Sequence, residues 1–286
     1  MKKYLTSDRA MLQECPWCNS AKKTVWGKTL RGFKSVKCRD CGLIYVQNRL
    51  NDDGLRKYYD NYLSGEHQVN KIWNEQRKLM YDLEFKLIDS YCRPGRVLDV
   101  GCSGGYFLDY FKKAGFDCCG VEIGEEAVKE ARKKYRVYAG NFPSIKFNEK
   151  FDLIVFRGVI EHVPVPKAYL DKAVQLLNKN GFIYITSTPN TDSFCCKLFE
   201  EKWNQHEPES HIAHFRPAHF DDYFKQKGFD KTAEKYFYEE TPYMNIEEDI
   251  QKIAKAIELK KQGRAVDFIS PPFYGNMMSL IYRKKN

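Results

Sequence analysis

Four cysteines near the start of the chain have the spacing of a metal site. Cys15 and Cys18 form one C-x2-C pair, and Cys38 and Cys41 form a second pair after nineteen intervening residues. Each pair can sit on a tight turn that aims two thiolates at one point, and two such turns complete the tetrahedral sulfur site that zinc prefers. Gly42, directly after the second pair, allows the unusual backbone angles of such a turn. The sequence therefore predicts a structural Zn²⁺ ion bound by these four cysteines.

Histidines gather in a second stretch, HEPESHIAHFRPAHF (206–220), which holds four of the six histidines of the chain. Histidine binds metals and transfers protons near neutral pH, so the stretch is a candidate for a second metal site or for a substrate-binding loop. His211 and His214 are three residues apart and would need further ligands to hold zinc. We therefore favour contact with a substrate, with His211 as the preferred residue.

A glycine-rich turn in DVGCSGGYF (99–107) is the third candidate for chemistry. Between a strand and a helix, such a turn lets a ligand approach the backbone closely. Gly101, Gly104 and Gly105 do not have the G-x-G-x-x-G spacing of nicotinamide-binding proteins. Twenty-one residues after Gly101, an apolar run ends in Glu122, which is placed to accept hydrogen bonds from ribose hydroxyls.

Short apolar runs alternate with helical patterns from residue 96 onward. The runs lie at 96–100, 117–122, 136–140, 151–156 and 181–190. This alternation predicts parallel strands with helices on both faces, an α/β doubly wound fold. Before it, residues 69–92 carry apolar side chains at helical spacing and predict an amphipathic helix. We expect a zinc-ribbon module over 1–50, a linker with this helix over 51–92, and the α/β domain over 93–286.

Composition and charge exclude several classes of protein. The chain has 286 residues and a formal net charge of +9. Its hydrophobic residues make up 43%, which is enough apolar content for a packed core. The N-terminus lacks the apolar stretch of a secretory signal, and the longest apolar runs are far shorter than a bilayer span. We expect a soluble cytoplasmic protein without a membrane partner, in which the six other cysteines are buried thiols.

Several motifs together resemble class I S-adenosylmethionine-dependent methyltransferases. VLDVGCSGGYFL, Glu122, FDLIVFRGVIEHVPVP and NGFIYITSTPN stand in the order and spacing of that family. The resemblance covers roughly residues 69–286 and implies a Rossmann-like sheet of seven strands, parallel except for a last antiparallel strand. Residues 277–286 suit that strand, paired with one near 229–238, and we expect a helical insertion at about 241–276 to cap the active site.

The resemblance also implies roles for individual residues. S-adenosylmethionine would be the cofactor, and the residues implied to bind it are Asp99, Gly101, Ser103, Gly105, Glu122, Ile123, Asn141 and Phe142. Glu122 would hold the ribose, with Ile123 against the adenine. His162 follows the fourth strand of the domain, at the edge where an acceptor would lie, so it is our first candidate for a general base, with His211 next.

The motif around Glu161 and His162 differs from a metal-binding motif found in some relatives. They have E-x-x-E-H at this place and bind a divalent ion through the carboxylates, whereas Gly158 stands at the position of the first glutamate here. One ligand is missing, so we do not expect metal-dependent methyl transfer from this motif.

Three functions fit the sequence. The favoured one is methyl transfer to a small molecule, at a hydroxyl of a sugar, a nucleotide-sugar or a related biosynthetic intermediate. This choice follows a looser similarity of the ribbon to N-terminal modules of some bacterial methyltransferases. The alternative is an RNA methyltransferase whose ribbon reads RNA, although the basic residues are scattered among acidic ones. A non-catalytic scaffold would need a damaged cofactor motif. The acceptor and the oligomeric state stay open.

Overall fold

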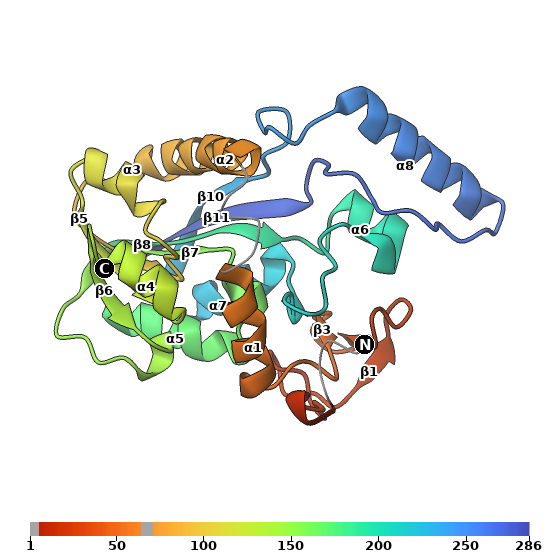
Figure 1. The fold of residues 1–286 in the computed structure, drawn as a ribbon, viewed down its shortest axis with the longest axis horizontal. Coiled ribbons are helices and arrows are strands. Elements are labelled where there is room, and N and C mark those ends of the chain that lie inside the picture. The colour runs from red at the N-terminus through yellow and green to blue at the C-terminus, as the bar shows by residue number, and fades with distance from the viewer. Residues whose placement is uncertain (1–5, 64–70, 286) are drawn as a thin grey trace.

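A computed structural model describes residues 6–63 and 71–285, which form a seven-stranded α/β sheet with a small antiparallel sheet beside it (Figure 1). The strands of the large sheet are β4 (Arg96–Val100), β5 (Asp117–Glu122), β6 (Arg136–Ala139), β7 (Phe151–Arg157), β8 (Leu177–Pro189), β10 (Phe229–Lys235) and β11 (Met277–Lys284). Their order is β10-β11-β8-β7-β4-β5-β6, and β11 alone runs antiparallel to its neighbours. The predicted fold class is therefore confirmed, including the antiparallel last strand.

Helices cover both faces of the large sheet. On one face lie α2 (Lys71–Asp89), α3 (Leu108–Lys113) and α4 (Glu125–Ala131), and on the other lie α5 (Pro166–Leu176) and α7 (Pro217–Gln226). The central strands β4 and β7 are almost wholly buried, which explains why they consist of continuous apolar runs. Because β4, β5, β7 and β8 are parallel, the turns that follow them meet at one edge of the sheet.

The amphipathic helix predicted over 69–92 is α2, although residues 69 and 70 lie outside the described part of the chain. It buries Tyr81, Glu84 and Ile88, which are spaced to share one face, whereas Leu79 points away and is 55% exposed. A carboxylate at the centre of the buried face breaks the apolar pattern. Glu84 is paired there with Arg157 of β7, whose Nε lies 2.5 Å from its Oε2.

The small sheet contains the ribbon and one strand from elsewhere. β1 (Lys23–Val25), β2 (Ser35–Cys38) and β3 (Ile44–Val46) are followed by β9 (Ala213–His214), which pairs with β3. The fourth strand thus comes from the histidine-rich stretch, far along the chain. A strand of two residues carries no periodicity, so the sequence could not indicate this pairing.

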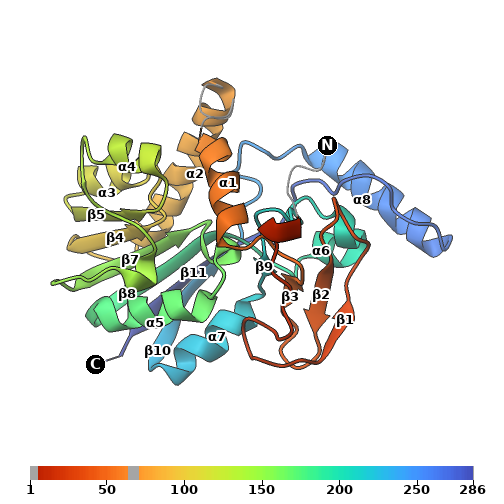
Figure 2. The same ribbon diagram turned by 60° about the horizontal axis from the view of Figure 1, so that its bottom comes forward.

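The remaining helices lie near the ribbon and beyond the end of β8. They are α1 (Asp52–Leu63), α6 (Phe194–Phe199) and α8 (Ile246–Lys261), and α8 packs on α6. Figures 1 and 2 show α6, α8 and the ribbon on the same side of the large sheet. α8 lies within the insertion expected at 241–276, and its capping role stays a prediction. Among the described helices, none combines the length and the apolar character needed to cross a bilayer.

Candidate functional site

The glycine-rich turn after β4 can be built only with glycine at two positions. Gly101 and Gly105 have φ values of +77° and +80°, in the left-handed region that side chains disfavour. A Cβ atom would come within 2.7 Å of Val159 at Gly101 and within 2.8 Å of Tyr135 at Gly105. The amides of Gly101 and Cys102 both donate to the carbonyl of Val121, so the turn is fastened to the end of β5.

Glu122, at the end of β5, joins the turns of two neighbouring strands. Its Oε2 accepts a hydrogen bond from the amide of Ser103 at 2.8 Å. Its Oε1 accepts from the amides of Ile123 and Gly124 at 2.7 and 2.9 Å. A carboxylate offers about four lone-pair positions, so Oε2 keeps one for a hydroxyl of a bound ligand. The carboxylate therefore joins the turns after β4 and β5 into one cradle, and it can still accept a hydrogen bond from a ligand bound there.

The other residues expected at the cofactor differ in accessibility. Ser103 lies in the turn with φ +48°, and Ile123 is 61% exposed beside Glu122. Asn141 follows β6, and its Oδ1 accepts a hydrogen bond from the Tyr169 hydroxyl at 2.7 Å. Phe142 is buried against Phe156 and Tyr169, so its ring packs in the core and is not available to an adenine in this conformation.

Asp99 lies beneath the turn at 2% exposure, and its Oδ1 has no hydrogen-bond partner among the described residues. Burial raises the pKa of this carboxyl to about 8, although Arg157 lies near enough to oppose the shift. Asp99 is therefore placed to receive a hydrogen bond from a ligand that reaches under the turn, rather than to line an open surface.

The two histidines expected to be catalytic are brought together. His162 ends the 3-10 helix Ile160–His162 that follows β7, and His211 lies just before β9. Their rings meet edge to face with centroids 4.8 Å apart. Nδ1 of His162 lies 3.0 Å from the carbonyl of Ser210, and Nδ1 of His211 lies 2.7 Å from that of Gln205. A carbonyl only accepts, so each Nδ1 carries the proton and each Nε2 keeps its lone pair.

Burial sets the charge of this group. It lowers the pKa of His162 to about 3, with repulsion from His211 adding to the effect, and it also lowers the pKa of His211. The neighbouring carboxyl of Glu161 is buried as well, and this raises its pKa to about 8. Both rings are thus neutral near pH 7. An imidazole with so low a pKa accepts protons weakly, which argues against His162 as a base acting alone.

The other three histidines of the 206–220 stretch serve its packing. His206 Nε2 lies 2.8 Å from the Ser35 hydroxyl of the ribbon. His219 Nε2 donates to the carbonyl of Cys41 at 3.0 Å. His214 is buried, and neither of its ring nitrogens has a hydrogen-bond partner among the described residues. Of the four histidines in this stretch, His211 is the one whose ring meets the ring of His162, in the 3-10 helix after β7.

The four ribbon cysteines converge on one point. Cys15 Sγ lies 3.6 Å from Cys41 Sγ, Cys18 Sγ lies 3.5 Å from Cys38 Sγ, and all four sulfur atoms lie within 4.8 Å of one another. Sulfurs at 2.3 Å from a tetrahedral zinc ion would be about 3.8 Å apart. The donor set and its spacing therefore fit a structural zinc ion.

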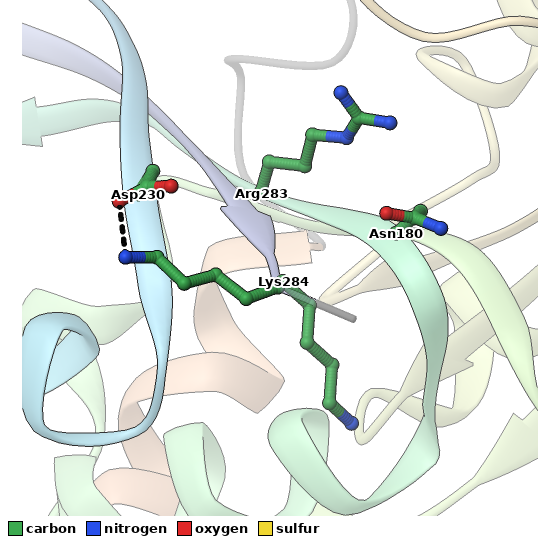
Figure 3. Close-up of a pocket in the computed structure, with 5 residues that line it drawn as sticks. Asn180, Asp230, Arg283 and Lys284 are labelled. Atoms are coloured by element: carbon green, nitrogen blue, oxygen red, sulfur yellow. Dashed lines mark ion pairs between the residues drawn. The ribbon is translucent and has the colours of Figure 1, made fainter.

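A separate cavity of about 290 Å³ lies at the opposite edge of the large sheet (Figure 3). Asn180 at the start of β8, Asp230, Arg283, Lys284 and Lys285 line it, and Lys285 forms an ion pair with Asp230 at 2.9 Å. It is open and lies at the amino ends of the parallel strands. In this fold class ligands bind at the carboxyl ends, so the turns after β4 and β5 remain the candidate site.

Comparison with known proteins assigns a family to most of the α/β domain. A methyltransferase domain family matches residues 73–234. The ubiquinone biosynthesis O-methyltransferase of Hydrogenovibrio crunogenus is 24% identical over 143 residues, which cover 46% of this chain and 56% of that protein. The chain spans about half the length of the curated relatives it matches.

Solved structures share the fold. The 1,6-didemethyltoxoflavin-N1-methyltransferase of Burkholderia thailandensis superposes with a TM-score of 0.55 at 13% identity, covering 93% of this chain and 100% of that one. A possible histamine N-methyltransferase of Thermotoga maritima gives 0.52 at 20% identity, covering 75% and 94%. At these identities the likeness concerns the fold alone.

Proposed function

The chain belongs to the methyltransferase domain family, and we propose that it transfers a methyl group from S-adenosylmethionine to a hydroxyl of a small-molecule acceptor. The observation that carries the proposal is the cradle at the ends of β4 and β5, where Glu122 bonds the amides of Ser103, Ile123 and Gly124. When bound, S-adenosylmethionine would supply an electrophilic methyl group on its sulfonium.

Different residues of the cradle would bind different parts of the cofactor. The Gly101–Gly105 turn would admit the methionine part, because neither glycine has a side chain to fill it. Glu122 would accept hydrogen bonds from the ribose hydroxyls through its remaining lone pair. Ile123 would offer apolar surface to the adenine, and Asn141 would border it from the end of β6.

An oxygen acceptor is supported from two sides. The curated relatives are named O-methyltransferases. A hydroxyl must lose its proton near the transition state, and His162, His211 and Glu161 gather after β7, at the edge that holds the cradle. We propose that these three residues bind the acceptor hydroxyl and take part in removing its proton. A sugar or nucleotide-sugar remains an acceptor to be tested, because no described residue singles it out.

We further propose that the ribbon binds one zinc ion and holds the histidine-rich stretch 206–220 in place. β3 pairs with β9, His206 bonds Ser35, and Trp17 packs edge to face on Phe215. These contacts fix the residues that flank His211. They account for the ribbon without an RNA partner, so the alternative of an RNA methyltransferase gains no support from them.

The test is a screen of purified zinc-loaded chain with S-adenosylmethionine against sugars, nucleotide-sugars, phenols and RNA. Mass spectrometry should show a gain of about 14 Da, one CH₂, on a small hydroxyl compound, with one S-adenosylhomocysteine formed per product. A gain on RNA alone, or on a nitrogen or carbon of every methylated compound, would contradict the proposed acceptor class.

A further inference from the structure

An ion pair between Glu84 of α2 and Arg157 of β7 is enclosed where α2 packs on the large sheet. Arg157 Nε lies 2.5 Å from Glu84 Oε2, and the side chains of Arg157 and Glu84 are 14% and 1% exposed. Taking two charges out of water costs free energy that offsets their attraction, so such a pair adds little net stability. Two apolar side chains could fill the same space in the core. The pair is therefore better explained by the effect of its charges on the neighbouring site.

Hydroxyl groups at the end of β8 hold the Glu84 carboxylate as an anion. Its Oε1 accepts hydrogen bonds from the hydroxyls of Ser187 at 2.5 Å and Thr186 at 3.2 Å, and its Oε2 accepts from Arg157. Donors that bond a carboxylate favour its ionised form. Arg157 in turn has no second ion-pair partner among the described residues. One negative charge thus faces one positive charge.

The guanidinium of Arg157 lies beside the glycine-rich turn. The last paired residues of β4 and β7 are followed by Gly101 and Arg157, so this arginine stands level with the first glycine of the turn. Its Cζ lies 4.4 Å from the centre of the Tyr81 ring and 5.9 Å from the centre of the Phe107 ring, just beyond the turn. A positive charge is therefore held next to the place proposed for the methyl donor.

An unbalanced cation at this place would oppose binding of the donor. The sulfonium of S-adenosylmethionine is positively charged, whereas the thioether of S-adenosylhomocysteine is neutral. Charges act over several ångströms in a buried region, where water screens them weakly. Asp99 and Glu161 also lie near Arg157, but burial raises the pKa of each to about 8, so both are mostly uncharged near pH 7. Glu84 is therefore the counter-charge of the arginine.

We propose that Glu84 is a positioning residue of the donor site, which holds Arg157 in place and balances its charge so that a cationic sulfonium can bind beside it. The inference rests on the proposed function, because it requires S-adenosylmethionine at the turns after β4 and β5. Without the Glu84 charge the turn would favour S-adenosylhomocysteine, and this product would inhibit the enzyme more strongly. The two ligands share every part except the charged methyl group. The affinity for S-adenosylmethionine relative to S-adenosylhomocysteine, which we call the donor preference, therefore measures the effect of the sulfonium.

Isothermal titration calorimetry of the zinc-loaded chain with each ligand at pH 7 measures the donor preference. We expect Glu84→Gln to lower it at least about tenfold, because the unpaired guanidinium repels the sulfonium. Removing both charges, in Glu84→Gln combined with Arg157→Gln, should restore it to within about threefold of the wild type, which separates charge from shape. Asp82→Asn is the matched control, since it removes a carboxylate that pairs with Lys86 on the same helix, and it should leave the donor preference unchanged.

Contrary results separate the inference from the proposed function. Equal donor preference in Glu84→Gln and the wild type, or a double variant that stays as low as Glu84→Gln, overturns the inference and leaves the proposed function standing. Should Glu84→Gln fail to fold, Arg157→Gln alone decides. It should keep the affinity for S-adenosylhomocysteine and a donor preference no lower than that of the wild type. Equal weakening of both ligands in Arg157→Gln would mean that the arginine binds a part that they share, and this also overturns the inference. A wild-type chain that binds neither ligand refutes the proposed function together with the inference.

Discussion

Replacing Glu122 with glutamine tests how the cradle binds its ligand. The carboxylate accepts three amide hydrogen bonds, one through Oε2 and two through Oε1. A carboxamide can keep the two bonds to Ile123 and Gly124 through its oxygen, but its NH₂ group then faces the N–H of Ser103. The variant loses one charge-assisted bond to the turn and the negative charge that a ribose hydroxyl would meet.

Hydrogen bonds to charged groups contribute about 1.5–3 kcal/mol each. We therefore expect Glu122→Gln to weaken S-adenosylmethionine binding roughly 10- to 150-fold. Isothermal titration calorimetry measures the affinity, and a binding stoichiometry near one shows that the variant is folded. Glu126→Gln is the matched control, since Glu126 is exposed on α4 and bonds only Lys129 among the described residues. Equal affinities in the two variants would refute the role given to Glu122.

Four further outcomes follow from the same structure. Cys38→Ser should release the zinc ion, measured by plasma mass spectrometry, and should raise hydrogen exchange in β9 (Ala213–His214) and at the amide of Val46, which donates to Ile212, because the pairing of β3 with β9 loosens. Gly101→Val should abolish cofactor binding in calorimetry, since its Cβ would lie 2.7 Å from Val159 at a left-handed φ. His162→Asn removes one member of the group proposed to act on the acceptor hydroxyl, so kcat should fall about 10²- to 10⁴-fold, the range for groups that act together in proton transfer, while cofactor affinity stays nearly unchanged. In His206→Gln the free energy of unfolding should fall less steeply than in the wild type as the pH drops below about 6.5.

The sign of the pH effect follows from burial. Burial lowers the pKa of His206, so the unfolded chain binds a proton near the ordinary value of about 6.5 and the folded chain does not. The contribution of neutral His206 to the free energy of unfolding is fully present above that value. It is lost as the pH falls toward the pKa of the folded chain, by up to about 1.4 kcal/mol per pH unit. Chemical denaturation at pH 7.5 and 5.5 measures it.

Results of the opposite kind would contradict these expectations. Stoichiometric zinc in Cys38→Ser would contradict the zinc site, and unchanged exchange at β9 would mean that the ribbon does not hold the stretch 206–220 in place. Tight cofactor binding by Gly101→Val would move the cofactor away from the turn. A fall in kcat matched by an equal loss of cofactor affinity would make His162 a part of the cofactor pocket. Equal pH slopes in His206→Gln and the wild type would mean that His206 is protonated in the folded chain.

Local patterns were sufficient to predict the α/β sheet and the cysteine cluster. The apolar runs at 96–100 and 151–156 are buried on both faces of the sheet, so they carry a signal that needs no tertiary information. The spacing of Cys15 and Cys18 reflects one tight turn, and such a turn is a property of the local sequence.

Long-range pairing could not be predicted in the same way. Glu84 is a single acidic residue on an amphipathic helix, and only the folded chain places Arg157 of β7 beside it. The pairing of β9 with β3, and the meeting of His211 with His162, depend on how a loop crosses the sheet edge. Phe142 was expected to bind the cofactor because it follows Asn141 after β6. Its ring packs in the core instead, and the sequence alone did not show which way the ring points.

A crystal structure of the zinc-loaded chain with S-adenosylhomocysteine tests most directly whether the ends of β4 and β5 hold a methyl donor. The ribose hydroxyls should lie within hydrogen-bond distance of the Glu122 carboxylate, with the homocysteine part against the Gly101–Gly105 turn. Density for the ligand elsewhere, for example in the cavity lined by Asn180 and Arg283, with an empty turn after β4, would contradict the claim.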